Sequence, residues 1–301
     1  GDLAFGPTPR GGPQTWVPPD EPLVELPREA DDLKALMDAA AAVEAGDAEG
    51  QHHARERHAY TDVGGARPKT RIRHEGRQWI AKFPAAMDRF DDPRVEAACL
   101  DVAEAAGFQV PQRKIVVAGR RAALFVERFD REAGTDGRPY AYLSAATLLK
   151  HPSTSYNTQR TYLDIAASAR TIGVPDAPAA IFERLLLNAY LHNTDDHLRN
   201  QAFIDNGYGW KPSPVFDLVP HPDKARHVCA PAPGTTPAWD VEEAFRAHVP
   251  FRIETARAVE IRDRIVQAAR RLPEFMDLRE VSKSDRAFLK NAFPEEIRFQ
   301  A

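Results

Sequence analysis

A cluster of polar and charged side chains, HNTDDHLRN at residues 192–200, directly follows the apolar segment 181–191. Within it, Asp195 and Asn200 have the spacing DxxxxN, and Asp217 follows inside the sequence SPVFDLVP. Phosphoryl transfer from ATP requires an aspartate that accepts the proton of the attacking hydroxyl, and an asparagine and a second aspartate that hold Mg²⁺. Mg²⁺ keeps water and phosphate oxygens as its other ligands, so two protein oxygens are enough. The residue types and their order therefore predict Asp195 as the general base and Asn200 and Asp217 as magnesium ligands.

Two other interpretations of this cluster remain open. The pattern DxxxxN is common by chance in polar loops, so the segment can also be read as a solvated loop. The side chains of His192, Asp195, Asp196 and His197 can also be read as ligands of a metal-dependent phosphohydrolase, in which the metal activates a water molecule. The second interpretation leaves the glycine motif and Lys82, described next, without a role.

A double glycine and two lysines lie upstream, in VGGARPK at residues 63–69 and in WIAKFP. Glycines let backbone amides approach phosphate oxygens, and successive amides in a tight turn form an anion-binding nest. Lys69 adds a positive charge, and Lys82 resembles a strand lysine that contacts the phosphates of ATP. We expect Glu96 or Glu104, on the following helix, to pair with Lys82. A plain Gly-Gly turn and a solvent-exposed lysine are the competing interpretations.

The elements that must position these residues change in character along the chain. Strand patterns come first, as two hairpins with turns at Glu75-Gly76 and Gly119-Arg120. A helix lies between the hairpins and another, rich in alanine, precedes them; later segments have helical patterns interrupted by two short strands. The expected helices cover residues 28–46, 92–106, 143–149, 162–170, 181–191, 256–272 and 284–293, and the two short strands cover 201–204 and 209–213. This order predicts an α+β fold, with sheet and helices segregated and a boundary near Glu127–Asp130.

Composition limits the class of protein. A chain of 301 residues is long enough for two lobes. Its two cysteines are too few for a disulfide framework and fit a reducing compartment, so we expect a cytoplasmic protein. We find no membrane-spanning stretch or signal peptide, and a net charge of −4 argues against broad electrostatic binding of nucleic acid. The sequence begins without methionine, and we expect an upstream domain to be missing.

In this order, GGARPKT, WIAKFP, LFVERFDR, NTDDHLRN and SPVFDL resemble the motifs of the HipA family of serine/threonine kinases, toxins of bacterial toxin–antitoxin pairs. The resemblance implies a two-lobed protein-kinase-like fold, with a smaller sheet-rich N-lobe (1–126) and a larger helical C-lobe (127–301). It implies ATP and Mg²⁺ as cofactors and a protein substrate such as an aminoacyl-tRNA synthetase. It also implies a HipB-like DNA-binding antitoxin as partner, through which any contact with DNA would be indirect.

The resemblance also assigns roles to residues. Asp195 is the expected base, Asn200 and Asp217 are the metal ligands, and Phe216 packs beside the nucleotide. The backbone of the hinge, residues 127–129, would read the adenine edge. The residues implied in nucleotide binding are Gly64, Gly65, Ala66, Arg67, Pro68, Lys69, Lys82, Glu127, Arg128, Phe129, His197, Leu198, Arg199, Asn200, Phe216 and Asp217.

The chain departs from the family pattern in two places. Family members commonly carry a serine before the glycine loop, where autophosphorylation inactivates the kinase, whereas this chain has Asp62 there with Thr61 beside it. Our hypothesis is that the fixed charge of Asp62 mimics or replaces that switch. The small N-terminal domain of many full-length members is also absent from the sequence. A second functional hypothesis is a nucleotide-binding pseudokinase that acts through protein contacts in a repressor complex.

Overall fold

The computed structural model describes residues 28–29, 37–38, 67–119, 121–133, 137–151, 160–224 and 226–299. Residues 61–66, which include the double glycine and Asp62, lie outside the described residues, as does most of the expected helix over 28–46. The expected start of that helix is wrong, because Arg28–Glu29 forms a short strand, β1, that pairs in parallel with β2. An open strand edge offers backbone hydrogen-bond partners, and this pairing overrides the local helix preference.

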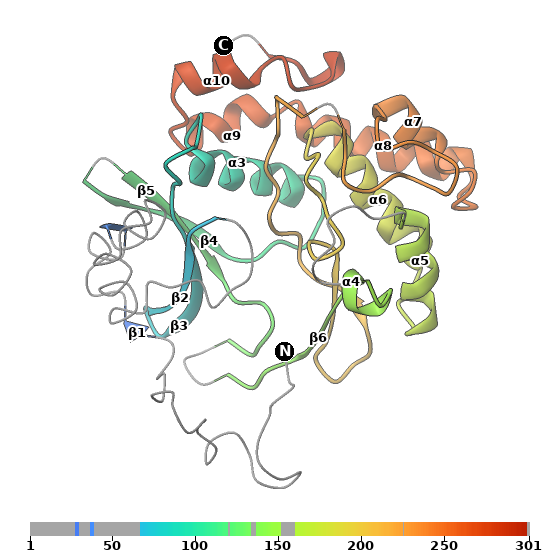
Figure 1. The fold of residues 1–301 in the computed structure, drawn as a ribbon, viewed down its shortest axis with the longest axis horizontal. Coiled ribbons are helices and arrows are strands. Elements are labelled where there is room, and N and C mark those ends of the chain that lie inside the picture. Colours follow the sequence, from blue (N-terminus) through green and yellow to red (C-terminus); the bar gives the residue numbers. More distant parts are fainter. Residues whose placement is uncertain are drawn as a thin grey trace, which may run out of the picture.

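A five-stranded sheet forms the first part of the described chain, with the strand order β1-β2-β3-β5-β4 (Figure 1). Both predicted hairpins are present as antiparallel pairs. The first turns through Glu75 and Gly76, which both have positive φ, as a two-residue hairpin turn matched to strand twist requires. The strands are β2 (Lys69–His74), β3 (Arg77–Lys82), β4 (Arg113–Ala118) and β5 (Arg121–Glu127).

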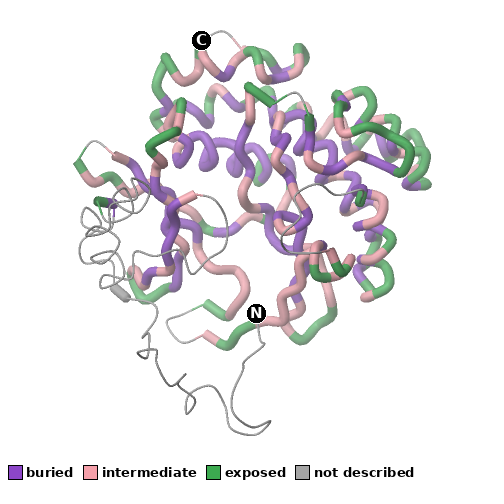
Figure 2. The backbone as a smooth tube through the Cα atoms, in the orientation of Figure 1, coloured by how far each residue is buried: buried purple, intermediate pink, exposed green. Residues whose placement is uncertain are grey.

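Helix α3 (Asp92–Ala105) joins this sheet to the rest of the molecule. Its first turn is capped by the Asp91 side chain, which accepts a hydrogen bond from the Arg94 amide at 3.1 Å, and Pro93 stands where a helix needs no amide donor. The helix contacts β4 and β5 on one side and α8 and α9 on the other. Figure 2 shows it buried along most of its length. Its side chains therefore have fixed positions between sheet and helices.

The remaining elements are mainly helical and include a second, three-stranded antiparallel sheet of order β6-β7-β8. The predicted helix over 143–149 begins too early, because Leu143 and Ser144 belong to strand β6 and pair with β7. Helix α7 has no counterpart among the predicted elements. The predicted helix over 256–272 ends earlier, at Ala269 of α8, because the ring of Pro273 would clash with the Ala269 carbonyl in a continuous helix. Leu272 instead begins the separate helix α9, which was not predicted. The elements are β6 (Ala141–Ser144), α4 (Ala145–Leu148), α5 (Tyr162–Thr171), α6 (Ala177–Tyr190), β7 (Ala202–Asp205), β8 (Lys211–Pro212), α7 (Val241–Arg246), α8 (Thr255–Ala269), α9 (Leu272–Leu278), α10 (Lys283–Leu289) and a 3-10 helix (Glu295–Ile297).

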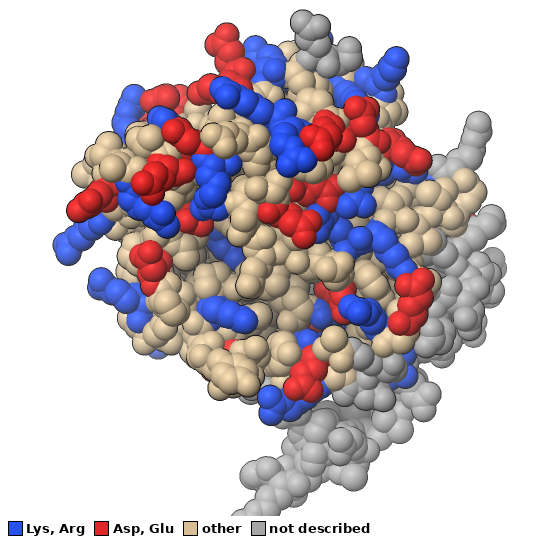
Figure 3. Space-filling model, turned by 180° about the vertical axis from the view of Figure 1, so that it is seen from behind, with Lys and Arg blue, Asp and Glu red and all other residues tan. Residues whose placement is uncertain are grey.

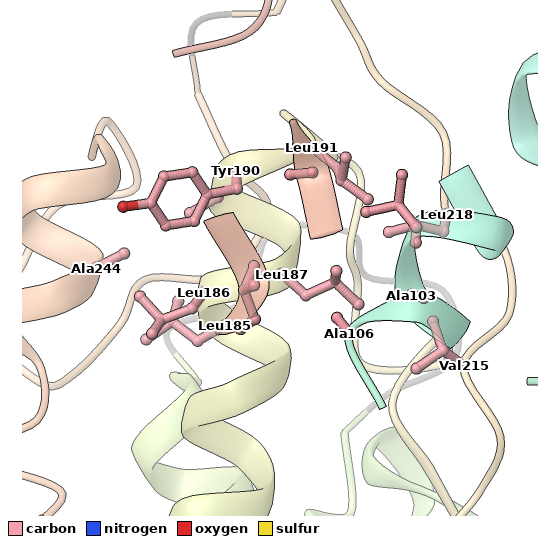
Figure 4. Packing of buried hydrophobic residues seen from close by; sticks show 14 of the residues in the cluster. Ala103, Ala106, Leu185, Leu186, Leu187, Tyr190, Leu191, Val215, Leu218 and Ala244 are labelled. Atoms are coloured by element: carbon pink, nitrogen blue, oxygen red, sulfur yellow. The ribbon is translucent and has the colours of Figure 1, made fainter. Parts of the chain in front are cut away.

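The main hydrophobic core lies between α3, α6 and the helices that follow them. Figure 4 shows Leu187 of α6 pointing toward Ala103 and Ala106 at the end of α3, whereas Leu185 and Leu186 point the other way, toward Ala244. Beside Ala103 and Ala106 lie Val215 and Leu218. These last two residues flank Phe216 and Asp217, and both are buried. The segment that carries Asp217 is therefore fixed to the core on both sides.

The mixed helix-and-sheet architecture predicted from the sequence is confirmed, and the division into lobes at residue 127 stays a prediction. No described helix has both the length and the apolar character needed to cross a membrane. Figure 3 shows lysine and arginine interspersed with aspartate and glutamate over one face. On this face there is no broad surface of a single sign.

Candidate active site

Three charged side chains from separate parts of the chain meet beside β3. The Nζ atom of Lys82 lies 2.6 and 2.9 Å from the two carboxylate oxygens of Glu96 on α3. The same Nζ atom lies 2.7 Å from Oδ1 of Asp217. The Glu96 side chain is 2% exposed and that of Lys82 is 13% exposed, so these are partly desolvated ion pairs. Of the two glutamates considered from the sequence, Glu96 pairs with Lys82, whereas Glu104 lies near the surface and pairs with Arg113.

The backbone of Asp217 is held in an unusual conformation. Its φ is +58°, in the left-handed region that costs energy for residues other than glycine, although aspartate tolerates it better than most. The amide of Asp217 donates to Oε1 of Glu96 at 3.1 Å, and its carbonyl accepts from Nδ2 of Asn193 at 3.4 Å. These contacts compensate the strain and direct the carboxylate toward Lys82.

The electrostatic environment keeps both partners charged. Burial lowers the pKa of Lys82, but Asp217 and Glu96 together raise it above its usual value. Burial also disfavours ionisation of Asp217, yet Lys82, Lys69 and His197 hold its pKa well below the usual range. An ionised carboxylate is therefore available here at neutral pH.

Two lysines stand opposite each other on neighbouring strands of the sheet. In the β2–β3 register, Lys69 pairs directly with Lys82. Like charges in this position destabilise a sheet unless an anion lies close to them. Burial lowers the pKa of Lys69, and Asp217 opposes that shift, so the carboxylate acts on both lysines. Two lysines and two carboxylates thus meet here, and the lysines carry the N–H donors that phosphate oxygens accept.

The residues between the double glycine and β2 are bound to neighbouring elements. The Arg67 guanidinium lies 2.5 Å from Asp88 and 2.7 Å from Asp92, which opens α3. The Pro68 carbonyl accepts a hydrogen bond from the Phe83 amide at 3.0 Å. Arg67 thus fixes the end of the expected phosphate loop to the start of α3. Oδ2 of Asp92 accepts no hydrogen bond, although the Arg67 charge is near it. Burial of the carboxylate therefore outweighs the attraction of Arg67 and raises the pKa of Asp92 to about 7.

The two neighbouring aspartates of the 192–200 loop have different environments. Asp195 is 44% exposed, and its Oδ1 accepts a hydrogen bond from Nζ of Lys224 at 3.0 Å. Asp196 is buried and accepts hydrogen bonds from the Tyr162 hydroxyl, from Asn188 at 2.8 Å and from Gln201 at 2.7 Å. Asp195 is therefore accessible to a substrate, whereas Asp196 ties the loop to α5 and α6.

The rest of the loop has mixed roles. The Leu198 side chain is buried in the core and its carbonyl accepts from the Ala146 amide, so it anchors the loop and does not face a ligand. Arg199 is partly buried in the turn, and Asn200 is buried where the loop leads to β7. The hydrogen bond from Asn193 to the Asp217 carbonyl places the loop close to the Asp217 segment. No hydrogen bond joins the Asn200 carboxamide to Asp217 in the part of the chain that the structure describes.

The expected hinge is only partly available for backbone recognition. The amide of Glu127 donates to the Gln112 carbonyl at 2.8 Å, and that of Arg128 donates to the Gln78 carbonyl at 2.9 Å. Both amides are therefore already bound to neighbouring backbone, and the assignment of residues 127–129 as an adenine-reading hinge stays a prediction. The Phe129 ring lies 5.4 Å from the Phe216 ring, between centroids. The two segments thus meet in an aromatic contact.

The donor atoms near Asp217 fit a hard divalent cation. Carboxylate and carboxamide oxygens are the ligands that Mg²⁺ prefers, and Asp217 is held ionised. Among the described residues, no three His, Cys, Asp or Glu side chains are grouped as a metal site. The four side chains of the phosphohydrolase interpretation do not share one site. Asp196 accepts hydrogen bonds from Asn188 and Gln201, and the His192 ring lies beside the His227 ring.

Sequence reasoning missed several residues of this site. Lys224 contacts Asp195 across 29 positions, and Tyr162 contacts Asp196 across 34 positions. Asn193 lies in the segment 192–200 but was given no role from the sequence, although its side chain links Asn188 of α6 to the Asp217 carbonyl. Only Asn193 lay inside a recognisable pattern, so the other contacts had no sequence signal.

One comparison with known proteins identifies the family of this chain. A family model described as HipA-like C-terminal domain matches residues 61–272. A chain of the Shewanella oneidensis MR-1 toxin–antitoxin complex of HipA, HipB and operator DNA is similar in structure, with a TM-score of 0.60 and 18% identity. The match covers 78% of this chain and 63% of that one, so the chain spans less than two thirds of that relative's length. The Helicobacter pylori proinflammatory kinase CtkA matches with a TM-score of 0.47 and 14% identity, over 72% of this chain and 90% of CtkA. No curated protein matches the sequence.

Proposed function

The chain belongs to the family of HipA-like C-terminal domains, and from this membership and the geometry beside β3 we propose that it is an ATP-dependent serine/threonine protein kinase. Its fold would be the two-lobed kinase arrangement, with an N-lobe over 1–126 and a C-lobe over 127–301. The observation that supports this most strongly is the convergence of Lys82, Glu96 and Asp217 from three separate segments.

The proposed reaction needs little covalent chemistry from the protein. The hydroxyl oxygen of the acceptor attacks the γ-phosphorus of ATP, the bond from that phosphorus to the β–γ bridging oxygen breaks, and ADP leaves. Asp195, exposed at the loop, accepts the proton of the attacking hydroxyl. Lys69 and Lys82 hold phosphate oxygens, and Glu96 keeps the Lys82 ammonium in place.

Magnesium completes this proposal. Asp217 and Asn200 would hold it, and when bound it neutralises charge on the phosphate oxygens. The glycines 64 and 65 with Ala66 would add backbone amides to the phosphate site. The adenine would lie near Phe129 and Phe216, whose aromatic contact connects the end of the sheet to the Asp217 segment.

The substrate and the partner follow from the family. We expect the acceptor to be a protein of translation, such as an aminoacyl-tRNA synthetase. The matched Shewanella complex contains HipB and operator DNA, so we expect a HipB-like DNA-binding antitoxin to bind this chain and to mediate any contact with DNA.

The direct test compares Asp195→Asn with Asp263→Asn in transfer of radiolabelled phosphate from ATP to a panel of aminoacyl-tRNA synthetases. Asp263 is a suitable control because its side chain is 49% exposed, close to the 44% of Asp195, and pairs with Arg262 away from the site. We expect Asp195→Asn to be slower by about 10² to 10⁴ and Asp263→Asn to be unchanged.

Two outcomes would count against the proposal. Transfer by Asp195→Asn as fast as by the parent would refute the assignment of the base. Binding of ATP by the parent without transfer to any acceptor would favour the pseudokinase alternative.

A further inference from the structure

The segment that follows Asp217 runs alongside the 192–200 loop and is fixed to it at both ends. The amide of His221 donates to the His192 carbonyl at 3.0 Å, and the amide of Val228 donates to the Thr194 carbonyl at 2.9 Å. Between these points, residues 221–224 form a turn closed by the Lys224 amide and the His221 carbonyl, 3.0 Å apart. Lys224 is therefore presented to the loop by a bound turn.

The same turn is also tied to the sheet part of the chain. The Asp223 carboxylate lies 2.6 Å from the guanidinium of Arg89, which follows β3. The Arg89 guanidinium in turn stacks over the ring of Phe288, 4.4 Å from its centroid. The turn that carries Lys224 is thus also contacted, through an exposed ion pair, by the connection between β3 and α3.

The Lys224 ammonium has a partner but is not buried by it. Its Nζ atom lies 3.0 Å from Oδ1 of Asp195, and its side chain is 52% exposed, against 13% for Lys82. Lysine has three donors on a flexible chain, so one contact with Asp195 leaves others for a ligand. Within the described part of the chain, this contact is the only side-chain hydrogen bond of Asp195, which leaves Oδ2 to receive a proton.

We propose that Lys224 is a catalytic residue of this site: with ATP bound, its ammonium contacts an oxygen of the transferred phosphoryl group while it still holds Asp195. This inference rests on the proposed kinase function. Charge spreads over the three equatorial oxygens of the phosphoryl group during transfer, and a fixed cation stabilises that charge more than it stabilises the ground state. Lys69 and Lys82 lie beside Asp217, so Lys224 supplies a positive charge on the side of the base.

Lys224 stays protonated throughout the step. The oxygen–phosphorus bond to the acceptor forms, the bond to ADP breaks, and the hydroxyl proton passes to Asp195. The lysine therefore acts by charge and position alone. For that reason arginine at position 224 should retain part of the effect, whereas methionine, which is similar in length but neutral, should lose it.

Calorimetry with a mimic of the transition state tests this without knowledge of the protein substrate. The full chain is titrated with Mg²⁺ and ADP, alone and with aluminium tetrafluoride, which imitates the planar phosphoryl group in transit. We expect Lys224→Met to bind the fluoride complex about 10- to 100-fold more weakly than the parent, with ADP affinity within about threefold. Lys224→Arg should recover most of the lost affinity. Lys283→Met is the matched control, because Lys283 is exposed on α10 outside the proposed site.

The outcomes separate this inference from the proposed function. Failure of the parent to bind Mg²⁺ and ADP would overturn the kinase proposal itself. If the parent binds Mg²⁺ and ADP normally and Lys224→Met binds the fluoride complex as tightly as the parent does, the contact with Asp195 is a simple surface ion pair. That result would overturn the role of Lys224 but not the kinase proposal. Tighter binding by Lys224→Met would identify an inhibitory contact, and an equal loss for ADP would identify a purely structural one.

Discussion

Replacing Glu96 with glutamine is the perturbation whose effect the structure defines best. The carboxylate is 2% exposed and accepts hydrogen bonds from Lys82 at 2.6 and 2.9 Å and from the Asp217 amide at 3.1 Å. Glutamine keeps the size of the side chain but removes its charge and turns one acceptor into a donor that faces an ammonium. Lys82 then has Asp217 as its remaining partner and is drawn toward it.

The size of the effect follows from these contacts. Loss of a charge-assisted hydrogen bond costs about 1.5–3 kcal/mol, and a buried charge with one partner removed costs about 3–5 kcal/mol. Because Asp217 remains, we expect Glu96→Gln to lower the free energy of unfolding by about 2–4 kcal/mol. Displacement of Lys82 from the phosphates should lower kcat/KM for ATP by about 10- to 100-fold, which corresponds to about 1.4–2.8 kcal/mol.

Glu104→Gln is the matched control on the same helix. Its carboxylate is 60% exposed and lies 2.7 Å from Arg113, and an exposed pair of this kind contributes about 0–1 kcal/mol. Urea unfolding measures the stability of each variant, and initial rates of phosphate transfer at several ATP concentrations measure kcat/KM. Equal stability and activity of Glu96→Gln and the parent, or an equal loss in Glu104→Gln, would refute the reasoning.

Three further predictions concern neighbouring groups. Burial raises the pKa of Asp92 to about 7, so the folded chain binds this proton more tightly than the unfolded chain does. The contribution of Asp92 to the free energy of unfolding therefore falls by up to about 4 kcal/mol as pH rises from about 4 to 7. Asp92→Asn should therefore gain stability relative to the parent across that window in urea unfolding at each pH, and a constant difference would contradict this. Tyr162→Phe removes a hydrogen bond to buried Asp196 and should lower the free energy of unfolding by about 1–3 kcal/mol in the same assay; no loss would argue against Asp196 as the anchor of the loop. Asp217→Asn should abolish the magnesium-dependent part of the rise in Tm caused by ATP, as EDTA should for the parent; a rise in the variant that still depends on magnesium would exclude Asp217 as the ligand.

Local patterns in the sequence were sufficient for much of the fold. The Glu75-Gly76 turn between two apolar strands predicted the first hairpin, and the structure has strands on both sides of that turn. The helix expected over 92–106 is α3, which begins at Asp92 after the cap residue Asp91. Each signal comes from residues a few positions apart, where backbone geometry alone restricts the outcome.

The choice between Glu96 and Glu104 could not be made in this way. They are eight positions apart on one helix, so their side chains differ in direction by about 80°. A helix with one solvent face would show in its pattern which glutamate is buried. Helix α3 is packed against both the sheet and other helices, and its sequence therefore gives no such pattern.

Contacts between distant segments also escaped the sequence. Lys224 lies in an exposed, proline-containing turn, and nothing in its neighbours distinguishes it from any surface lysine. Its contact with Asp195 exists because two backbone hydrogen bonds hold residues 221 and 228 against the loop. Asp195 and Asp196 likewise differ in role because Tyr162 and Asn188, from helices α5 and α6, donate hydrogen bonds to Asp196. Such contacts are set by tertiary packing.

A crystal structure of the chain with Mg²⁺ and a non-hydrolysable ATP analogue tests the central claim most directly. We predict that the metal is bound by the Asp217 carboxylate and the Asn200 carboxamide, and that the γ-phosphate lies within reach of Asp195 and of Lys69 and Lys82. A nucleotide bound elsewhere, or a metal held by other side chains with Asp217 still paired to Lys82 alone, would contradict the account.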